Sequence, residues 1–190
     1  MTENGERGKN CEMNSEKTSL DQPLCLVIAG PNGAGKSTFA KQYLYSERGI
    51  DYCINADLIA SGISPARPEM AAFSAGRIFL QEFGRLSTFR ESFAIETTLS
   101  GIVYINRFKF LKAKGYRLEI IYLDLKDSGL AVKRVKARVR EGGHSISPKE
   151  IRRRFFRSRK NFLHHYIHLA DAWHHYDNSG REPILINKSW

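Results

Sequence analysis

Residues 30–37, which read Gly-Pro-Asn-Gly-Ala-Gly-Lys-Ser, constrain this chain more than any other part of its sequence. They match the pattern G-x-x-x-x-G-K-[ST], whose glycines allow a tight turn with several backbone N–H groups facing one point. A continuous apolar run, Leu24–Ala29, precedes the turn, and residues 37–44 after it have a helical pattern. This strand–turn–helix order is the context in which the pattern forms a phosphate-binding P-loop. We therefore predict a nucleoside triphosphate site here.

The fixed positions of the predicted P-loop have distinct chemical tasks. Lys36 is expected to reach the β- and γ-phosphates, and the Ser37 hydroxyl is expected to bind Mg²⁺. The helix that follows adds the positive end of its dipole. We expect ATP and Mg²⁺ as cofactors, held by Gly30, Pro31, Asn32, Gly33, Ala34, Gly35, Lys36, Ser37 and Thr38.

The rest of the chain alternates between short apolar runs and longer amphipathic segments. Strands separated by helices form parallel sheets with helices on both faces. The predicted fold is therefore α/β, in the three-layer arrangement of P-loop nucleotide kinases, with a parallel sheet of about five strands. We predict strands at residues 24–29, 52–55, 92–96, 117–123 and 183–187, and helices at residues 37–44, 68–86, 102–114, 128–141 and onward from 147.

The length of 190 residues favours one folded domain. Residues 1–22 are polar and offer almost nothing to bury, so we predict a disordered tail followed by one domain over residues 23–190. No run approaches the ~20 apolar residues that span a bilayer, and no signal-peptide core is visible. The three cysteines lack metal-ligand spacing, which indicates free thiols in a reducing compartment. We expect a cytoplasmic protein with no membrane partner.

The net charge of +10 is concentrated in one region of the chain. Residues 133–160 contain twelve basic side chains, opposed by Glu141 and Glu150 alone. Such a cluster attracts phosphates, which can belong to a nucleotide, a phosphorylated substrate or a nucleic acid. Composition does not choose among these ligands.

Two predicted helices in this basic region, joined by residues 142–144, have the design of a lid that closes over a nucleotide. Arg134 and Arg138 are four residues apart and so share one helix face. Arginines stabilise the charge that spreads over a transferring phosphate. Most of the basic side chains are expected on a solvated face, and Arg138, His144 and Arg154 are our catalytic candidates.

Polar side chains end the predicted strands at the edge where α/β sheets bind ligands. Asp57 there is either a general base for an acceptor hydroxyl or the cap of the next helix. Glu96 is expected to bind an acceptor hydroxyl or a metal-bound water, and Thr98 a polar group of the acceptor. The alternative is that both residues merely terminate their strand. Asp124 is interpreted as a turn residue, with a place near the phosphates as the alternative.

Five histidines are predicted to lie with Trp173 in a helix late in the chain. Pairs of histidines can bind metal, but no carboxylate or cysteine completes a site with them. We assign them core or surface roles. They are His164, His165, His168, His174 and His175.

Kinases of small molecules fit the sequence better than other P-loop proteins do. The H-R-D and D-F-G motifs of protein kinases and the N-K-x-D stretch of GTPases are absent from the sequence. ABC-type and motor ATPases need longer chains or partners. A nucleic-acid-binding NTPase is the alternative from another class. We disfavour it, because the aromatic residues near the basic cluster serve equally well as core residues.

Several motifs together resemble the zeta toxin family of P-loop kinases, from about Leu24 to the end of the sequence. The combination is specific, although each motif outside the P-loop is weak alone. The motifs are residues 30–38 (Gly-Pro-Asn-Gly-Ala-Gly-Lys-Ser-Thr), 55–57 (Asn-Ala-Asp), 93–98 (Phe-Ala-Ile-Glu-Thr-Thr), 134–139 (an Arg-Val pair at each end), 142–144 (Gly-Gly-His) and 176–179 (Tyr-Asp-Asn-Ser).

The resemblance implies a zeta-toxin-like P-loop kinase domain over residues 23–190. Zeta toxins transfer the γ-phosphate of ATP to the 3′-hydroxyl of UDP-N-acetylglucosamine, so a nucleotide-activated sugar is the implied substrate and an antitoxin protein an implied partner. Asp57 becomes the general base and Lys36 the phosphate clamp. Glu96 and Thr98 fall on the substrate side. Arg138 matches an arginine that stabilises the transferring phosphate.

The sequence departs from the family at three points. His144 stands where the longer toxins have a second catalytic arginine, and Arg153 or Arg154 would substitute for it. A glutamate of their substrate helix falls near Leu80, and their long C-terminal extension has no counterpart here. The acceptor is therefore open between UDP-N-acetylglucosamine and another sugar, nucleoside or alcohol.

Overall fold

The computed structural model describes residues 22–44, 48–143 and 145–189. The predicted tail over residues 1–22 lies outside this part except for Gln22, and the predicted site residue His144 also lies outside it. Within the described ranges, none of the helices has the length and apolar character that crossing a bilayer requires.

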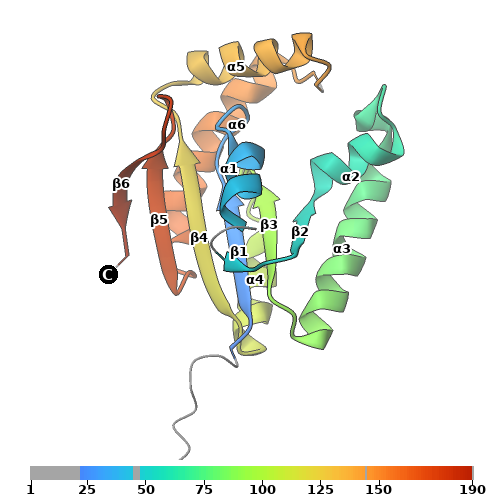
Figure 1. The fold of residues 1–190 in the computed structure, drawn as a ribbon, viewed down its shortest axis with the longest axis vertical. Coiled ribbons are helices and arrows are strands. Elements are labelled where there is room, and N and C mark those ends of the chain that lie inside the picture. Colours follow the sequence, from blue (N-terminus) through green and yellow to red (C-terminus); the bar gives the residue numbers. More distant parts are fainter. Residues whose placement is uncertain (1–21, 45–47, 144, 190) are drawn as a thin grey trace, which may run out of the picture.

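A six-stranded sheet with the order β2-β3-β1-β4-β5-β6 forms the centre of the molecule (Figure 1). The first five strands run parallel, and β6 pairs antiparallel with β5. The α/β class is confirmed, but the expected number of five strands is wrong. The strands are β1 (Leu24–Ala29), β2 (Tyr52–Asn55), β3 (Phe93–Thr97), β4 (Arg117–Asp124), β5 (Ala172–Asp177) and β6 (Ile184–Lys188).

The additional strand is β5, whose residues the sequence predicts as part of a histidine-rich helix, and that prediction is wrong. Trp173, His174 and His175 instead alternate across the sheet beside β4. Aromatic residues favour strands, but six half-buried positions in a row give neither the apolar run nor the clean alternation that marks a strand. His164 and His165 do lie in a helical segment, the π-helical Phe162–Tyr166.

Helices cover both faces of the sheet (Figure 1). The expected helix over residues 68–86 is a short 3₁₀ turn, Pro68–Ala71, that leads into a longer α-helix. Ser147 caps the helix predicted to begin there, because its hydroxyl accepts a hydrogen bond from the Glu150 N–H. The α-helices are α1 (Lys36–Tyr43), α2 (Ala56–Ile63), α3 (Ala72–Phe89), α4 (Tyr104–Ala113), α5 (Ser128–Arg140) and α6 (Pro148–Asn161).

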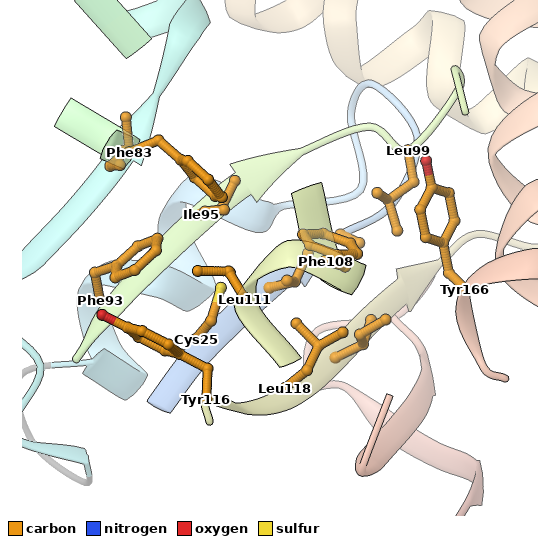
Figure 2. Close-up of a cluster of buried hydrophobic side chains, with 14 of the residues drawn as sticks. Cys25, Phe83, Phe93, Ile95, Leu99, Phe108, Leu111, Tyr116, Leu118 and Tyr166 are labelled. Atoms are coloured by element: carbon orange, nitrogen blue, oxygen red, sulfur yellow. The ribbon is translucent and has the colours of Figure 1, made fainter. Parts of the chain in front are cut away.

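Two hydrophobic cores lie on opposite faces of the sheet. Against α3 and α4, aromatic rings meet edge to face (Figure 2). The ring centroid of Phe93 lies 5.8 Å from those of both Phe83 and Tyr116. Against α1, α5 and α6, smaller aliphatic residues such as Leu26 and Val135 fill the other core. Because β1 alternates its side chains between these two cores, it is buried on both faces. Burial of this kind is typical of the central strand of a parallel sheet.

The strand order positions the P-loop. β1 lies between β3 and β4, so the turn that follows β1 emerges at the carboxyl edge of the sheet with the ends of both neighbours beside it. Ligands of open α/β sheets bind at this edge.

Candidate active site

Three glycines give the P-loop its shape. Gly30, Gly33 and Gly35 have φ angles of 141°, 81° and 83°, which L-residues with a side chain rarely adopt. A Cβ on Gly30 would lie 2.1 Å from the carbonyl oxygen of Leu123 in β4. The loop therefore packs against β4 at a distance that only glycine permits.

Lys36 begins α1 and is buried, with 8% of its surface exposed. Its Nζ donates a hydrogen bond to the Pro31 carbonyl, 3.1 Å away, so the side chain folds over the loop. Burial lowers the pKa of Lys36. The nearby Glu96 and Asp57 oppose this shift, whereas two arginines reinforce it. Four charged groups thus act on Lys36, and with it they make a cluster of five: Lys36, Asp57, Glu96, Arg138 and Arg154.

A cleft of about 710 Å³ contains these five groups. It opens at the carboxyl edge of the sheet, between the P-loop, the start of α2 and the basic helices. Its lining includes six of the nine predicted P-loop residues and all the described catalytic candidates. The polar side chains that line it are Asn32, Lys36, Ser37, Thr38, Asn55, Asp57, Ser61, Glu69, Glu96, Arg134, Arg138, Ser145 and Arg154.

Asp57 is in the cleft and does not cap α2. The cap is Asn55, whose Oδ1 accepts hydrogen bonds from the N–H groups of Asp57 at 2.9 Å and Leu58 at 3.2 Å. Because Asn55 satisfies the helix end, the carboxylate of Asp57 is left exposed to the cleft. The alternative interpretation of Asp57 as a helix cap is wrong.

Glu96 lies near the end of β3 and faces the P-loop. The Ser37 hydroxyl donates a hydrogen bond of 2.9 Å to its Oε1. A serine hydroxyl and a carboxylate are the oxygen ligands that Mg²⁺ takes in sites completed by substrate phosphates. The residues present therefore fit the expected ion.

Thr98 is placed differently from Glu96. Its hydroxyl lies 3.0 Å from the Ser100 hydroxyl, and its carbonyl accepts a hydrogen bond from Ser158 of α6. It is not among the residues that line the described cleft. A substrate contact by Thr98 stays a prediction.

Asp124 is the last residue of β4 and is not among the residues that line the described cleft. It is 4% exposed and accepts hydrogen bonds from Arg159 at 2.8 and 2.9 Å. His175 lies 3.0 Å from the same carboxylate. Burial alone would raise the pKa of Asp124, but the hydrogen bonds from His175 and Arg159 lower it overall. This carboxylate is a structural anchor for α6.

The basic helices contribute three arginines to the cleft. Arg134 and Arg138 of α5 both line it, as their spacing predicts, and Arg154 reaches it from α6. Glu150 binds Arg154 Nε at 2.7 Å and also pairs with Arg153, and these bonds lower the pKa of Glu150 to about 2. Between the two substitutes that we considered for His144, Arg154 is the one that lines the cleft.

Two residues shape the P-loop through contacts that the sequence does not predict. Asn178, in the turn after β5, donates a hydrogen bond of 2.7 Å to the carbonyl of Ala34. Arg134 donates to the carbonyls of residues 178–180. Asn178 belongs to the Tyr-Asp-Asn-Ser motif that supports the family resemblance, but nothing in its local sequence relates it to a loop 144 residues away.

The chain matches no family model. It is 31% identical over 140 residues to an uncharacterised protein of Haemophilus influenzae, a match that covers 74% of this chain and 98% of that protein. Its fold is similar to a chain of the PezAT chromosomal toxin–antitoxin system of Streptococcus pneumoniae, with a TM-score of 0.68 and 19% identity over 92% of this chain and 75% of that one.

Two further solved structures share the fold. AvrRxo1-ORF1:-ORF2 with ATP has a TM-score of 0.68 and 17% identity over 88% of this chain and 58% of that one. Deoxyadenosine kinase of M. mycoides with bound dATP has a TM-score of 0.51 and 14% identity over 82% and 91%.

The sheet order, the P-loop and these neighbours define a protein with the P-loop kinase fold, which it shares with the chain of the PezAT system. Within that class, the chain belongs to the same family as the Haemophilus influenzae protein.

Proposed function

We propose that this protein is an ATP-dependent kinase that transfers the γ-phosphate to a hydroxyl of a small molecule. One observation carries the proposal. A lysine, two arginines and two carboxylates from five different elements or loops converge on one cleft beside a P-loop. A site for binding nucleotide alone has no need of an exposed carboxylate opposite the phosphate-binding lysine.

The geometry supports a division of tasks within the cleft. The P-loop N–H groups and Lys36 hold the phosphates of ATP. Asp57 accepts the proton of the acceptor hydroxyl. The hydroxyl oxygen forms a bond to the γ-phosphorus as the bond between that phosphorus and the β–γ bridging oxygen of ATP breaks. Arg138 and Arg154 stabilise the negative charge on the transferring group. ADP and a phosphorylated acceptor are the products.

Ser37 and Glu96 are the residues that would hold Mg²⁺, Ser37 directly and Glu96 through the hydroxyl or a bound water. When bound, the ion neutralises charge that develops on the phosphates. Glu96 also lies close enough to Lys36 to favour the charged form of the lysine. Glu96 thus acts on two P-loop side chains: it accepts the hydrogen bond of Ser37, and its charge favours the protonated form of Lys36.

UDP-N-acetylglucosamine is the acceptor that the zeta toxin resemblance favours. The described part of the chain supports this as far as the catalytic residues go, since Asp57, Lys36 and Arg138 all line the cleft. The substrate helix differs, because Leu80 of α3 lines an apolar groove next to the cleft where the family has a glutamate. Another sugar, nucleoside or alcohol is the alternative acceptor.

An antitoxin partner and a cytoplasmic location complete the proposal. Two of the structural neighbours are described as a toxin–antitoxin system and as a complex of two open reading frames. A cytoplasmic protein would have both ATP and nucleotide-activated sugars at hand.

The test is to incubate the protein with Mg²⁺, ATP and a panel of UDP-sugars, nucleosides and simple sugars, and to detect phosphorylated products by mass spectrometry. We expect a product one phosphate heavier than UDP-N-acetylglucosamine, absent with Lys36→Ala. Lys133→Ala, an exposed lysine of α5, is the control. Normal turnover by Lys36→Ala would contradict the P-loop assignment. Tight, salt-dependent oligonucleotide binding without transfer would favour a nucleic-acid-binding NTPase instead.

A further inference from the structure

We propose that Asn178 is a positioning residue that orients the P-loop peptide between Ala34 and Gly35 toward the phosphates. The inference rests on the nucleotide half of the proposed function. Its basis is the hydrogen bond from Asn178 Nδ2 to the Ala34 carbonyl, 2.7 Å long, which joins the turn after β5 to the middle of the loop.

The planarity of the peptide bond turns this contact into a constraint on the neighbouring N–H group. In a trans peptide the carbonyl oxygen and the following N–H point in opposite directions. When Asn178 holds the Ala34 carbonyl, the N–H of Gly35 must therefore point to the other side. Gly35 lines the cleft, and inward-facing N–H groups are what a P-loop uses to bind phosphate oxygens.

Gly35 is shaped to accept this arrangement. Its φ of 83° lies in the left-handed region, and a Cβ there would come within 2.7 Å of Asn178 Nδ2. A side chain at residue 35 would therefore displace the amide of Asn178. The glycine of the sequence pattern is needed both for its conformation and for the space that Asn178 occupies.

Asn178 is itself held firmly, so that its side chain acts as a fixed clamp. Its N–H donates to the Asp124 carbonyl at 2.9 Å, and its own carbonyl accepts from Arg134 at 2.7 Å. Arg134 also donates to the carbonyls of Ser179 and Gly180, and the Ser179 hydroxyl accepts from the Lys126 N–H. The turn is thus bound to β4 on one side and to α5 on the other.

Arg134 gives this clamp a link to the basic helices. It lies one helical turn before Arg138, and both side chains line the cleft. The residue that fixes the turn and the residue proposed to stabilise the transferring phosphate therefore share one rigid helix. The position of α5 and the orientation of the loop are set together.

Binding of ATP to variants of Asn178, measured by isothermal titration calorimetry with Mg²⁺, tests this inference. Asn178→Asp keeps the shape but replaces the N–H donor by a carboxylate oxygen that repels the Ala34 carbonyl. We expect its dissociation constant to rise about tenfold or more, the effect of losing one well-formed hydrogen bond and leaving its partner unpaired. Asn187→Asp, an exposed site on β6 with the same charge change, is the control and should bind like wild type.

A second readout separates positioning from a general loss of stability. In glycine-labelled protein, the ¹⁵N–¹H resonance of Gly35 should move when ATP binds to wild type, and should start from a different position in Asn178→Asp. Asn178→Gln keeps an amide donor and should recover part of the affinity. If Asn178→Asp is too unstable to study, the Gln variant alone must still show a shifted Gly35 resonance.

The results distinguish this inference from the proposed function. If wild type binds ATP and Lys36→Ala weakens it, while folded Asn178→Asp binds ATP like wild type, the inference about Asn178 fails and the kinase proposal stands. An unchanged Gly35 resonance in Asn178→Asp would also overturn the inference. If wild type does not bind ATP, both fail.

Discussion

Carboxylates lie on both sides of the P-loop at the same edge of the sheet, and the molecule uses the two sides differently. On one side, Asp57 follows β2 and Glu96 lies near the end of β3, both in the cleft. On the other side, Asp124 ends β4 and is sealed by Arg159 and His175. The strand-end position is common to all three. What differs is whether a neighbouring element buries the carboxylate and forms an ion pair with it, as Arg159 does with Asp124.

Helix α6 accounts for the difference. Its last turns pack over the end of β4, where Arg159 binds Asp124. On the β2 side, no such anchor reaches Asp57 among the described residues that line the cleft. One side of the loop therefore provides fixed support, and the other remains open for chemistry.

The largest effect should come from the open side. Asp57→Asn removes the proposed base and should lower the rate of transfer by a factor of about 10²–10⁴, the usual contribution of general base catalysis. ATP affinity and melting temperature should stay near wild type, because Asn55 still caps α2. Product formation under saturating ATP measures the effect. Asp51→Asn, exposed just before β2, is the matched control. Equal turnover in Asp57→Asn and wild type would remove Asp57 as the base.

Glu96→Gln should have the next largest effect. The variant keeps the shape but loses the negative charge beside Ser37 and Lys36. Supporting ligands around a metal typically contribute about 10–100-fold to metal affinity or activity, so the Mg²⁺ concentration for half-maximal rate should rise by a factor in that range. Titration of the rate with Mg²⁺ checks this, with the exposed Glu91→Gln as the control. An unchanged Mg²⁺ requirement would show that Glu96 serves only the acceptor or the strand.

On the closed side, stability should change instead of chemistry. Asp124→Asn leaves Arg159 without its carboxylate and should lower the free energy of unfolding by about 2 kcal/mol. This is less than the 3–5 kcal/mol for a fully buried pair, because Arg159 is partly exposed. Urea denaturation measures the loss. A variant that folds as stably as wild type but has lost transfer would place Asp124 with the catalytic residues and contradict the comparison.

The acid dependence of stability sharpens the same contrast. The folded-state pKa of Asp124 is lowered, so its stabilisation is present above its unfolded pKa of about 3.9 and is lost as pH falls through the folded value. The difference in unfolding free energy between wild type and Asp124→Asn should therefore be constant above about pH 5 and shrink in more acidic solution. Denaturation curves from pH 7 downward test this. If the difference in unfolding free energy between wild type and Asp124→Asn grew on acidification, it would contradict a lowered folded-state pKa of Asp124.

Local patterns predicted most of the fold. The P-loop, the apolar strands and the start of α6 at Ser147 each have a signal within a few residues of sequence, and the structure confirms them. The strand β5 was missed because its six half-buried positions carry no clear periodicity. Its place in the sheet depends on pairing with β4, which no local pattern reveals.

The candidate site, like the fold, could be predicted where local sequence patterns define it. Lys36, Asp57 and Glu96 could be placed at one edge, since parallel strands end together. Which carboxylate is buried depends on Arg159, which reaches Asp124 from another element. The hydrogen bond from Asn178 to the P-loop likewise could not be predicted from the sequence, because it joins distant parts of the chain.

The contact between Ala34 and Asn178 also determines when the site can exist during synthesis. It joins residues 144 positions apart. At a translation rate of about 5–20 residues per second, roughly 7–30 s separate the two ends of this bond. The P-loop sequence leaves the ribosome early, but its strand β1 must wait for both neighbouring strands, and its loop for the turn after β5. The newborn chain is therefore expected to gain its nucleotide site late, as one of the last steps of folding.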